Sequence, residues 1–362
     1  MTQPRLLFVL PAKGASGGAN SVVQEAMGLA RFGLAVAIAV NHDNVGKFTA
    51  NYPELQPRGV AVLPYADPRA LGALLGQADV VCATTNGSVR EIAEARKTLA
   101  KGAGPKVAYY VQDYEPLFYA PNSEDWTGAH QSYTLIPGAT LFAKTRWLCD
   151  IVTRNHGVPV EKVEPSIDHD IYFPDVGRWA SETVSVVAML RPQTPRRAPR
   201  RTARILETLA DRFGDRMTFQ VFGADASVLA AHGIALSGRI ANHGVLRRTE
   251  VPHLLRAADL MLDLSDYQAF GRTALEGMAC GCVPVVPLFG GTAEFARHGA
   301  NSYVVDTRSD DAVLEAVEHF LSLTPAARQA LRLSALETAS RYSVDRAALS
   351  ELALFLRIAR QP

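Results

Sequence analysis

One stretch, from Asp259 to Gly291, constrains the fold of this chain more than any other. It reads in order as a buried strand, a polar loop, a helix and a second buried strand, at residues 260–265, 266–271, about 272–280 and 283–287. Gly281 supplies the stop signal for the helix. A strand, a helix and another apolar strand at this spacing predict one unit of a parallel α/β sheet.

The turn into this helix is a candidate anion site. A strand that enters a helix through a glycine, here Gly271, presents free backbone N–H groups. Arg272 lies in the first helical turn, where a positive charge opposes the helix dipole, so an anionic partner is indicated. Glu276 follows one turn later. Two plainer interpretations stay open, because Arg272 and Glu276 could form an ordinary surface ion pair and Gly271 could serve the turn alone.

This stretch resembles the signature of the retaining nucleotide-sugar glycosyltransferases of family 4. That signature is a Glu, seven residues, a second Glu, a run of small residues, Gly and Pro-Val-Val. Gln268 takes the place of the first Glu, Glu276 is the second, and residues 279–286 complete the pattern. The resemblance implies the GT-B fold, an α/β architecture of two Rossmann-like domains with doubly wound parallel sheets that face each other across a cleft.

The resemblance also implies a donor site. In the family the second Glu holds the ribose hydroxyls, the loop amides meet the diphosphate and sugar, and the first Glu contacts sugar hydroxyls. An amide both donates and accepts hydrogen bonds, so Gln268 keeps binding possible but leaves the identity of the sugar open. The implied donor-binding residues are Gly17, Gly18, Val245, Leu246, Gln268, Ala269, Phe270, Gly271, Arg272, Thr273 and Glu276.

An aromatic, acidic segment over 109–126 follows an expected strand at 107–111. Open α/β sheets place ligands at the carboxyl ends of their strands, and aromatic rings with carboxylates suit sugars; an ordinary aromatic patch under a loop is the alternative. Residues 112–119 resemble rhamnosyltransferases that extend bacterial surface glycans. This implies that Asp113 receives or orients the acceptor proton and that Gln112, Tyr114 and Glu115 contact the acceptor. A His that many family members carry in this neighbourhood is missing.

Six arginines lie within residues 191–204. They could form a nucleic-acid patch, although the chain is otherwise nearly neutral. Arg191 ends an expected strand, and Arg196 follows five residues later. The resemblance implies that both charges hold the diphosphate, which makes them catalytic candidates beside Asp113. We expect Arg200, Arg201 and Arg204 to lie on a solvated helix face.

The start of the chain predicts a βαβ unit: a strand at 5–10, a glycine loop, a helix from about Ser21 to Gly33 and a strand at 34–40. The loop glycines do not make the Gly-x-Gly-x-x-Gly pattern of dinucleotide-binding proteins. Gly17 and Gly18 match a family pair near the donor phosphates, and a flexible turn is the alternative.

No metal or cofactor is expected. Asp168-His169-Asp170 has the Asp-x-Asp spacing of a metal motif, but its surroundings favour a structural role before an interdomain linker at 172–183. The four cysteines show no zinc or disulfide pattern, and we expect them to be reduced and buried. A net charge of +1 gives no general reason to expect nucleic acid as a partner. No apolar run approaches the ~18–20 residues of a membrane span.

These observations predict a cytoplasmic protein of two domains. Residues 1–176 form the acceptor domain, residues 177–345 form the donor domain, and a last helix at about 346–362 packs back on the first. The predicted activity is transfer of L-rhamnose from dTDP-rhamnose to a bacterial surface glycan or lipid-linked oligosaccharide. Peripheral membrane association and membership in a larger glycan polymerase are compatible with it. The alternatives are an epimerase or phosphorylase of the same fold, and a nucleic-acid-binding protein.

Overall fold

The computed structural model describes residues 3–11, 17–100, 102–175, 177 and 182–361. The chain divides into two compact units, the first made of Met1–Ser166 with Ser343–Pro362 and the second of Ile167–Tyr342. The division falls after Ser166, and not between residues 176 and 177, because Ile167 and Tyr172 are buried in the core of the second unit.

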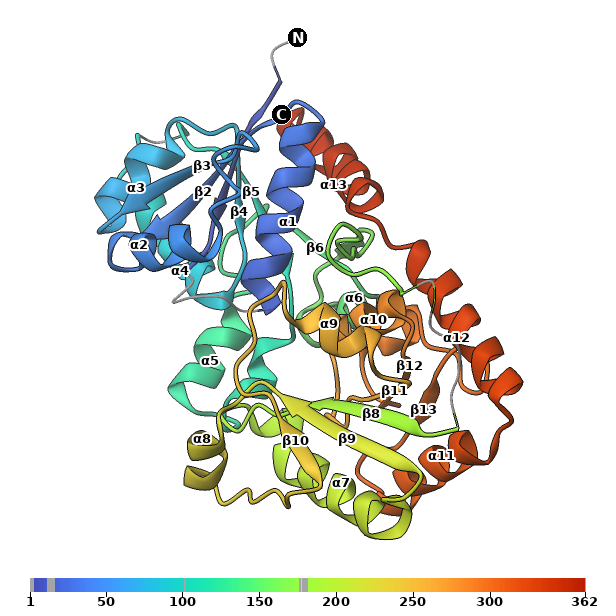
Figure 1. The fold of residues 1–362 in the computed structure, drawn as a ribbon. Coiled ribbons are helices and arrows are strands. Elements are labelled where there is room, and N and C mark those ends of the chain that lie inside the picture. Colours follow the sequence, from blue (N-terminus) through green and yellow to red (C-terminus); the bar gives the residue numbers. More distant parts are fainter. Residues whose placement is uncertain (1–2, 12–16, 101, 176, 178–181, 362) are drawn as a thin grey trace. The chain divides into compact units, whose positions relative to one another are not determined.

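The first unit contains a parallel sheet of seven strands among the described residues, in the order β3-β2-β1-β4-β5-β6-β7 (Figure 1). The strands are β1 (Arg5–Val9), β2 (Ala35–Asn41), β3 (Ala61–Tyr65), β4 (Val80–Ala83), β5 (Lys106–Val111), β6 (Thr140–Ala143) and β7 (Val160–Lys162). The helices are α1 (Gly17–Arg31), α2 (His42–Asn51), α3 (Pro68–Leu75), α4 (Asn86–Arg96), α5 (Glu124–Gln131), α6 (Arg146–His156) and α13 (Val344–Ala359), with a 3-10 turn η1 (Glu115–Phe118).

The second unit contains a parallel sheet of six described strands, in the order β10-β9-β8-β11-β12-β13. The strands are β8 (Val184–Met189), β9 (Met217–Phe222), β10 (Ile240–Asn242), β11 (Leu260–Leu262), β12 (Val283–Pro287) and β13 (Tyr303–Val305). The helices are α7 (Pro199–Phe213), α8 (Ala226–Ala231), α9 (Val251–Arg256), α10 (Arg272–Cys280), α11 (Asp310–Ser322) and α12 (Pro325–Ser340), with 3-10 turns η2 (Pro195–Arg197) and η3 (Gly291–Glu294).

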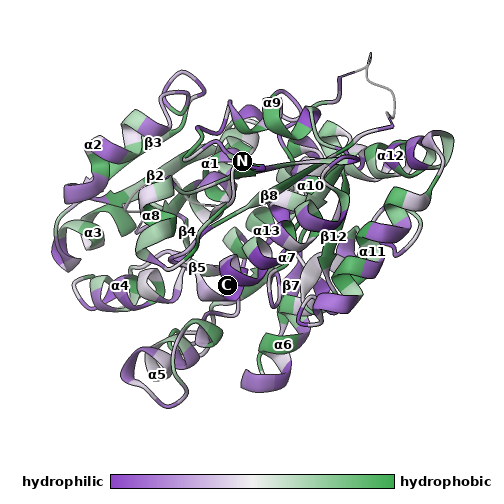
Figure 2. Cartoon of the chain, turned by 60° about the horizontal axis from the view of Figure 1, so that its bottom comes forward, coloured by the Kyte–Doolittle hydropathy of each residue, from purple (hydrophilic) through white to green (hydrophobic). Residues whose placement is uncertain are grey.

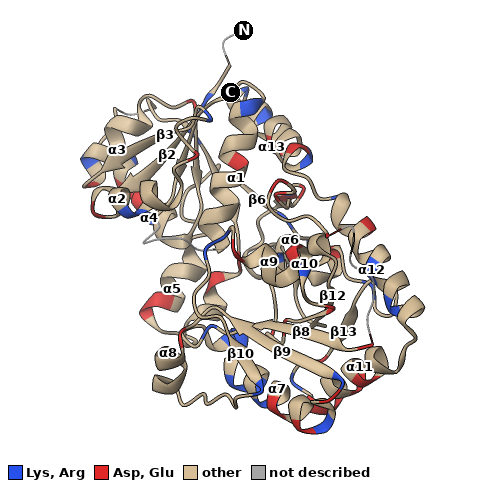
Figure 3. Cartoon of the chain, in the orientation of Figure 1, with Lys and Arg blue, Asp and Glu red and all other residues tan. Residues whose placement is uncertain are grey.

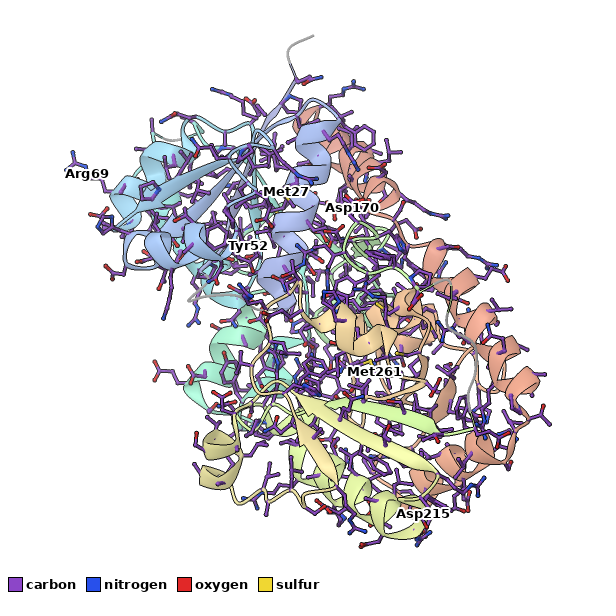
Figure 4. All side chains as sticks on the ribbon, viewed as in Figure 1. Met27, Tyr52, Arg69, Asp170, Asp215 and Met261 are labelled. Carbon is purple, nitrogen blue, oxygen red and sulfur yellow. The ribbon has the colours of Figure 1, made fainter. Side chains whose placement is uncertain are left out.

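Apolar residues fill both faces of the second sheet. One cluster joins the strands to α7 and α11, and another joins them to α9, α10 and α12. Met261, labelled in Figure 4, lies in β11 and is buried in the second cluster. Figure 2 colours the strands largely green, for hydrophobic residues, and the outer helices in alternating green and purple. The parallel, doubly wound α/β class that the sequence predicted is confirmed in both units.

The central stretch folds nearly as predicted. Helix α10 and strand β12 have the expected bounds, and Gly281 ends α10 with a φ of 92°. Strand β11 is shorter than expected, since it ends at Leu262. Strand β10 ends at Asn242, and Val245 is exposed in the loop that follows.

Helix α1 begins at Gly17, earlier than the expected start near Ser21. Cys82, Cys280 and Cys282 are buried as predicted, whereas Cys149 is partly exposed. Among the described residues no helix is both long and apolar enough to cross a bilayer.

Each sheet has one point at which the strand order reverses. It lies between β1 and β4 in the first unit and between β8 and β11 in the second. In open α/β sheets ligands bind outside the carboxyl ends of the strands at such points. The residues that follow these four strands are therefore the first candidates for a site.

Helix α13, the last of the chain, packs on the first unit through apolar and charged residues. Phe355 makes edge contacts with Phe8 and Phe142, with ring centroids 6.0 and 5.7 Å apart. Beside this apolar contact, Lys144 forms ion pairs with Glu25 of α1 and, at 3.1 Å, with Glu351 of α13. All three charged side chains are buried. One ammonium group thus faces two carboxyl groups in a low-dielectric core.

The burial and charges of this cluster shift the pKa of Glu351. Burial raises the pKa of its carboxyl well above 4.5, the nearby charge of Glu25 raises it further, and Lys144 opposes both. A carboxyl whose pKa is raised by folding contributes most to stability below its unfolded pKa, and this contribution is lost as the pH rises.

We predict that Lys144→Met lowers the free energy of unfolding by roughly 3–5 kcal/mol, because it leaves two buried carboxyl groups without their cation. Glu351→Gln removes the excess negative charge, so its loss should be much smaller. Its stability relative to the wild type should also rise as the pH increases above 4.5, where the unfolded Glu351 ionises. Denaturant unfolding of both variants between pH 5 and 8 measures this, and equal losses for the two variants would contradict it.

Candidate functional site

The loop after β11 is organised by one buried carboxylate. Asp263 follows the strand directly and is 8% exposed. Its Oδ1 accepts hydrogen bonds from Ser265 Oγ at 2.5 Å and from the Ser265 backbone N–H at 3.3 Å. Its Oδ2 accepts from Gln268 Nε2 at 2.6 Å and lies 4.0 Å from Arg197 Nη1. Beyond the end of the strand at Leu262, this side chain binds donors of the turn itself.

Gln268 is held by its backbone as well as by its side chain. Its carbonyl oxygen accepts from the Gly291 N–H at 2.6 Å, and its own N–H donates to Phe289 O at 3.4 Å. A Cβ at Gly290 would lie 2.1 Å from Gln268 O, so only glycine permits this approach. The loop and the segment before η3 are therefore packed backbone to backbone.

Gly271 sets the start of α10. Its φ is +92°, and a Cβ there would lie 2.9 Å from Thr292 Cγ2. The turn role of this glycine is thus required by the backbone, and its predicted role at an anion site stays a prediction. On either side, Phe270 packs edge-on against Phe295 with centroids 5.6 Å apart, and Thr273 lines a small pocket that also includes Asp263 and Arg197.

Arg272 and Glu276 do form an ion pair, at 3.0 Å, but it is not a surface pair. Their side chains are only 15% and 10% exposed. Burial raises the pKa of Glu276, while Arg272, Arg248 and a hydrogen bond from Tyr172 oppose that shift. Glu276 thus faces the charges of two arginines and the hydroxyl of Tyr172.

The arginine segment is largely paired within the second unit. Arg196 lies over the ring of Tyr267 at 5.2 Å. Arg191 is exposed just beyond β8. Other contacts run from Arg197 to Asp263, Arg200 to His232 O, Arg201 to Asp266 and Arg204 to Asp310. Figure 3 shows the basic residues of α7 with acidic residues of α11 close by.

These contacts correct one expectation. Arg201 is not on a solvated face, because its side chain is only 15% exposed and donates to Leu264 O and Asp266 at 2.7 Å each. Carboxylates already neutralise several of these charges, so the segment is a poor phosphate-backbone patch. Nothing in the described part of the chain favours the nucleic-acid alternative.

In the first unit, the predicted residues Gly18 and Gln112 are neighbours. A Cβ at Gly18 would lie 3.0 Å from Gln112 Oε1, and Gln112 Nε2 donates to Thr84 O at 2.9 Å. Thr84 follows β4, and its hydroxyl donates to Val9 O of β1 at 2.8 Å. These residues therefore gather where the strand order of the first sheet reverses. Gly17 starts α1 beside them, whereas all other predicted donor residues belong to the second unit.

The acidic segment after β5 faces largely inward. Asp113 is half-buried, and its Oδ1 accepts from the Tyr114 N–H at 2.9 Å. Tyr114 is buried, stacks on Tyr133, and contacts His156 Nε2 through its hydroxyl at 3.2 Å. Glu115 is also buried, so only Asp113 and Gln112 of the predicted acceptor residues are substantially accessible.

Glu115 binds the start of α4. Its Oε1 accepts from the Asn86 N–H at 2.9 Å, its Oε2 accepts from Asn86 Nδ2, and Tyr109 donates to Oε1 at 3.3 Å. Burial raises the pKa of Glu115 to about 7 against these donors, and Asp113 adds to the rise. Its predicted acceptor contact stays a prediction, while its observed partners are internal.

The segment Asp168-His169-Asp170 makes its observed contacts with other residues of the second unit. Asp168 pairs with Arg248 at 2.7 Å, and its Oδ1 accepts from the Asp170 N–H. Asp170, labelled in Figure 4, is exposed. Among the described residues no group of three or more His, Cys, Asp or Glu side chains is placed to hold a metal ion.

Two residues of the site were missed by the sequence analysis. Asp263 was included in an expected strand, although a carboxylate at the end of an apolar run was a signal that the strand stops there. Arg197 was passed over for its neighbour Arg196, and nothing in the sequence distinguishes which of two adjacent arginines lies near Asp263.

The pKa of Glu115 predicts a pH-dependent stability. Because folding raises this pKa from 4.5 to about 7, the contribution of Glu115 is full below pH 4.5 and is lost as the pH rises through 7. The loss amounts to roughly 3 kcal/mol at most. Glu115→Gln does not titrate, so the gap between its free energy of unfolding and that of the wild type should shift over this range. Urea unfolding at several pH values measures the gap, and a constant gap would refute the assignment.

One family model and several known proteins are similar to this chain. Residues 227–335 match the family model described as Glycosyl transferases group 1. D-inositol 3-phosphate glycosyltransferase from Mycobacterium tuberculosis is 26% identical over 179 residues, which cover 47% of this chain and 37% of that relative. The chain thus matches less than half the length of this curated relative.

Solved structures resemble nearly the whole chain. Anabaena Alr3699/HepE, in complex with UDP and glucose, has a TM-score of 0.78 and 16% identity, covering 98% of this chain and 100% of that one. A glycosyltransferase from Rickettsia africae has a TM-score of 0.77 and 15% identity, covering 100% of both chains. The chain therefore has the two-sheet α/β fold of the GT-B glycosyltransferases, and its residues 227–335 carry the group 1 glycosyltransferase pattern.

Proposed function

We propose that this protein is a glycosyltransferase that moves a sugar from a nucleotide diphosphate donor to a hydroxyl of an acceptor. The observation that carries the proposal is the buried Arg272–Glu276 pair at the start of α10. It lies within the region that matches the glycosyltransferase model. A buried ion pair of this kind has little value for stability once the cost of burial is counted, so a ligand role explains it better.

The donor site is proposed in the second unit. Glu276 accepts from the ribose hydroxyls, and the backbone N–H groups at the Gly271 turn meet the diphosphate, which suits a helix start. Arg191 and Arg196 stabilise the negative charge that develops on the departing diphosphate. The remaining predicted contacts are Val245 and Leu246 at the base and Gln268, Ala269, Phe270, Arg272 and Thr273 around the diphosphate and sugar.

The acceptor site is proposed in the first unit. Asp113 remains the candidate to receive or orient the acceptor proton, because its carboxylate is more accessible than that of Glu115. Gln112 lies beside Gly18 at the point where the strand order reverses. Tyr114 and Glu115 follow Asp113 in the sequence, are buried, and would hold the acceptor loop in place.

Finer features of the activity are proposals on the resemblance alone. They are retention of the anomeric configuration, no need for a metal or other cofactor, L-rhamnose from dTDP-rhamnose as the donor, and a bacterial surface glycan or lipid-linked oligosaccharide as the acceptor. UDP and glucose are bound by the Anabaena protein of the same fold, so UDP is the second nucleotide to test. A cytoplasmic location, peripheral attachment to the inner membrane face and a place in a larger polymerase accompany this proposal.

We predict that one of dTDP, UDP and GDP binds the full chain and that Glu276→Gln weakens this binding by about 10–100-fold, because a hydrogen bond to a charged group is lost. Calorimetric titration with EDTA present throughout measures the affinity and tests whether metal is needed. Glu337→Gln is the matched control, since Glu337 is 70% exposed on α12 in a pair with Arg341.

No binding of any of the three nucleotides to folded wild-type protein would contradict the donor site. If binding occurs, the same nucleotide linked to its sugar separates the enzyme classes. A transferase requires a glycan acceptor for turnover, whereas an epimerase alters or hydrolyses the nucleotide sugar without one.

A further inference from the structure

We propose that Asp263 is a positioning residue that fixes the orientation of the Gln268 side-chain amide, so that Gln268 presents its carbonyl oxygen to the donor sugar. This inference rests on the proposed function, because it concerns the sugar end of the same site. It makes Gln268 Oε1 a hydrogen-bond acceptor for a sugar hydroxyl and gives Asp263 no direct contact with the sugar.

The position of Asp263 follows from the sheet. It comes directly after β11, which pairs with β8 on one side and β12 on the other. The strand order reverses between β8 and β11, so Asp263 stands at the place where such sheets bind ligands. Its carboxylate is nevertheless turned into the loop, where Ser265 and Gln268 occupy it.

The chemistry of the partners decides which way the amide faces. An ionised carboxylate only accepts hydrogen bonds, so the group 2.6 Å from Asp263 Oδ2 must be the NH2 of Gln268 and not its oxygen. The second N–H of Gln268 donates to Ser265 Oγ at 3.0 Å, and that hydroxyl in turn donates to Asp263 Oδ1. Both amide donors are thereby used inside the loop. The oxygen of Gln268 is the group left for a ligand.

The surrounding backbone keeps this network in place. Ser265 O accepts from Thr307 Oγ1 at 2.6 Å, and Gln268 O accepts from the Gly291 N–H. Arg197 lies 4.0 Å from Asp263 and balances its charge. A fully connected polar network of this kind holds its members in one orientation.

The same geometry explains why Gln268 departs from the Glu of the resembled signature. A glutamate side chain at this position would place a second carboxylate about where the amide nitrogen now lies, next to Asp263. Two like charges this close cannot both stay ionised. With Asp263 present, an amide supplies an acceptor oxygen without that repulsion.

The test compares a nucleotide sugar with its own nucleoside diphosphate by calorimetry on the full chain. The probes are dTDP-L-rhamnose with dTDP and UDP-glucose with UDP. The quantity measured is the ratio of the two affinities, which reports the contact with the sugar. Asp263→Asn should lower this ratio about tenfold, because the introduced amide can itself donate to Gln268 and no longer fixes the orientation of that side chain. The affinity for the nucleoside diphosphate alone should stay within about twofold.

A pair of variants tests the orientation itself. Gln268→Glu should also lower the ratio of the affinity for the nucleotide sugar to that for the nucleoside diphosphate. Adding Asp263→Asn to it should restore most of the ratio, because the introduced amide then donates to one oxygen of the introduced carboxylate and leaves the other oxygen to accept from the sugar. Without ligand, Gln268→Glu should lower the thermal midpoint of unfolding, and the double variant should regain it. Asp211→Asn is the matched control. Asp211 is an exposed residue of α7 that pairs with Arg239.

The inference is overturned if Asp263→Asn leaves the affinity ratio unchanged, or if the double variant is no better than Gln268→Glu in the ratio and in the thermal midpoint. A purely structural role would lower the affinities for nucleotide and nucleotide sugar together, and that result also overturns it. Failure of the wild type to bind any of dTDP, UDP and GDP is a different outcome: it refutes the proposed function, and the sugar contact with it.

Discussion

Strand β11 is hydrogen-bonded on both sides, and all three of its residues are buried. A strand in this position cannot shift its register without exposing apolar residues and breaking two ladders. The point at which it stops is therefore fixed, and Asp263 is delivered to the carboxyl edge of the sheet beside the end of β8. The loop, the glycine turn and helix α10 all follow from that point.

Close backbone contacts then determine how the loop reaches α10. Gly290 lets the chain before η3 approach Gln268, and Gly271 lets the turn approach Thr292. A side chain at either glycine would push these segments apart. Because they are close, Arg272 and Glu276 lie in partly buried surroundings, where their charges interact more strongly than on a surface.

Buried charge serves different purposes in the two units. In the first, Glu115 holds the start of α4, and Lys144 joins two carboxyl groups where α13 packs. Their described partners are internal, which is the pattern of charges that organise a fold. In the second, Asp263 binds the side-chain amide of Gln268, and Glu276 pairs with Arg272 at the start of α10.

The sequence by itself determined the fold class, the bounds of α10 and β12, and the glycine turn that starts α10 with Arg272 in its first turn. These follow from apolar periodicity, glycine stops and the parallel α/β pattern, all of which act locally. Only the tertiary structure decided that Glu115 turns inward and that Asp263 binds the amide of Gln268. It likewise decided that Arg201 is paired. Each of these depends on contacts between side chains that the folded chain brings together, and residue spacing carries no information about which way such side chains face.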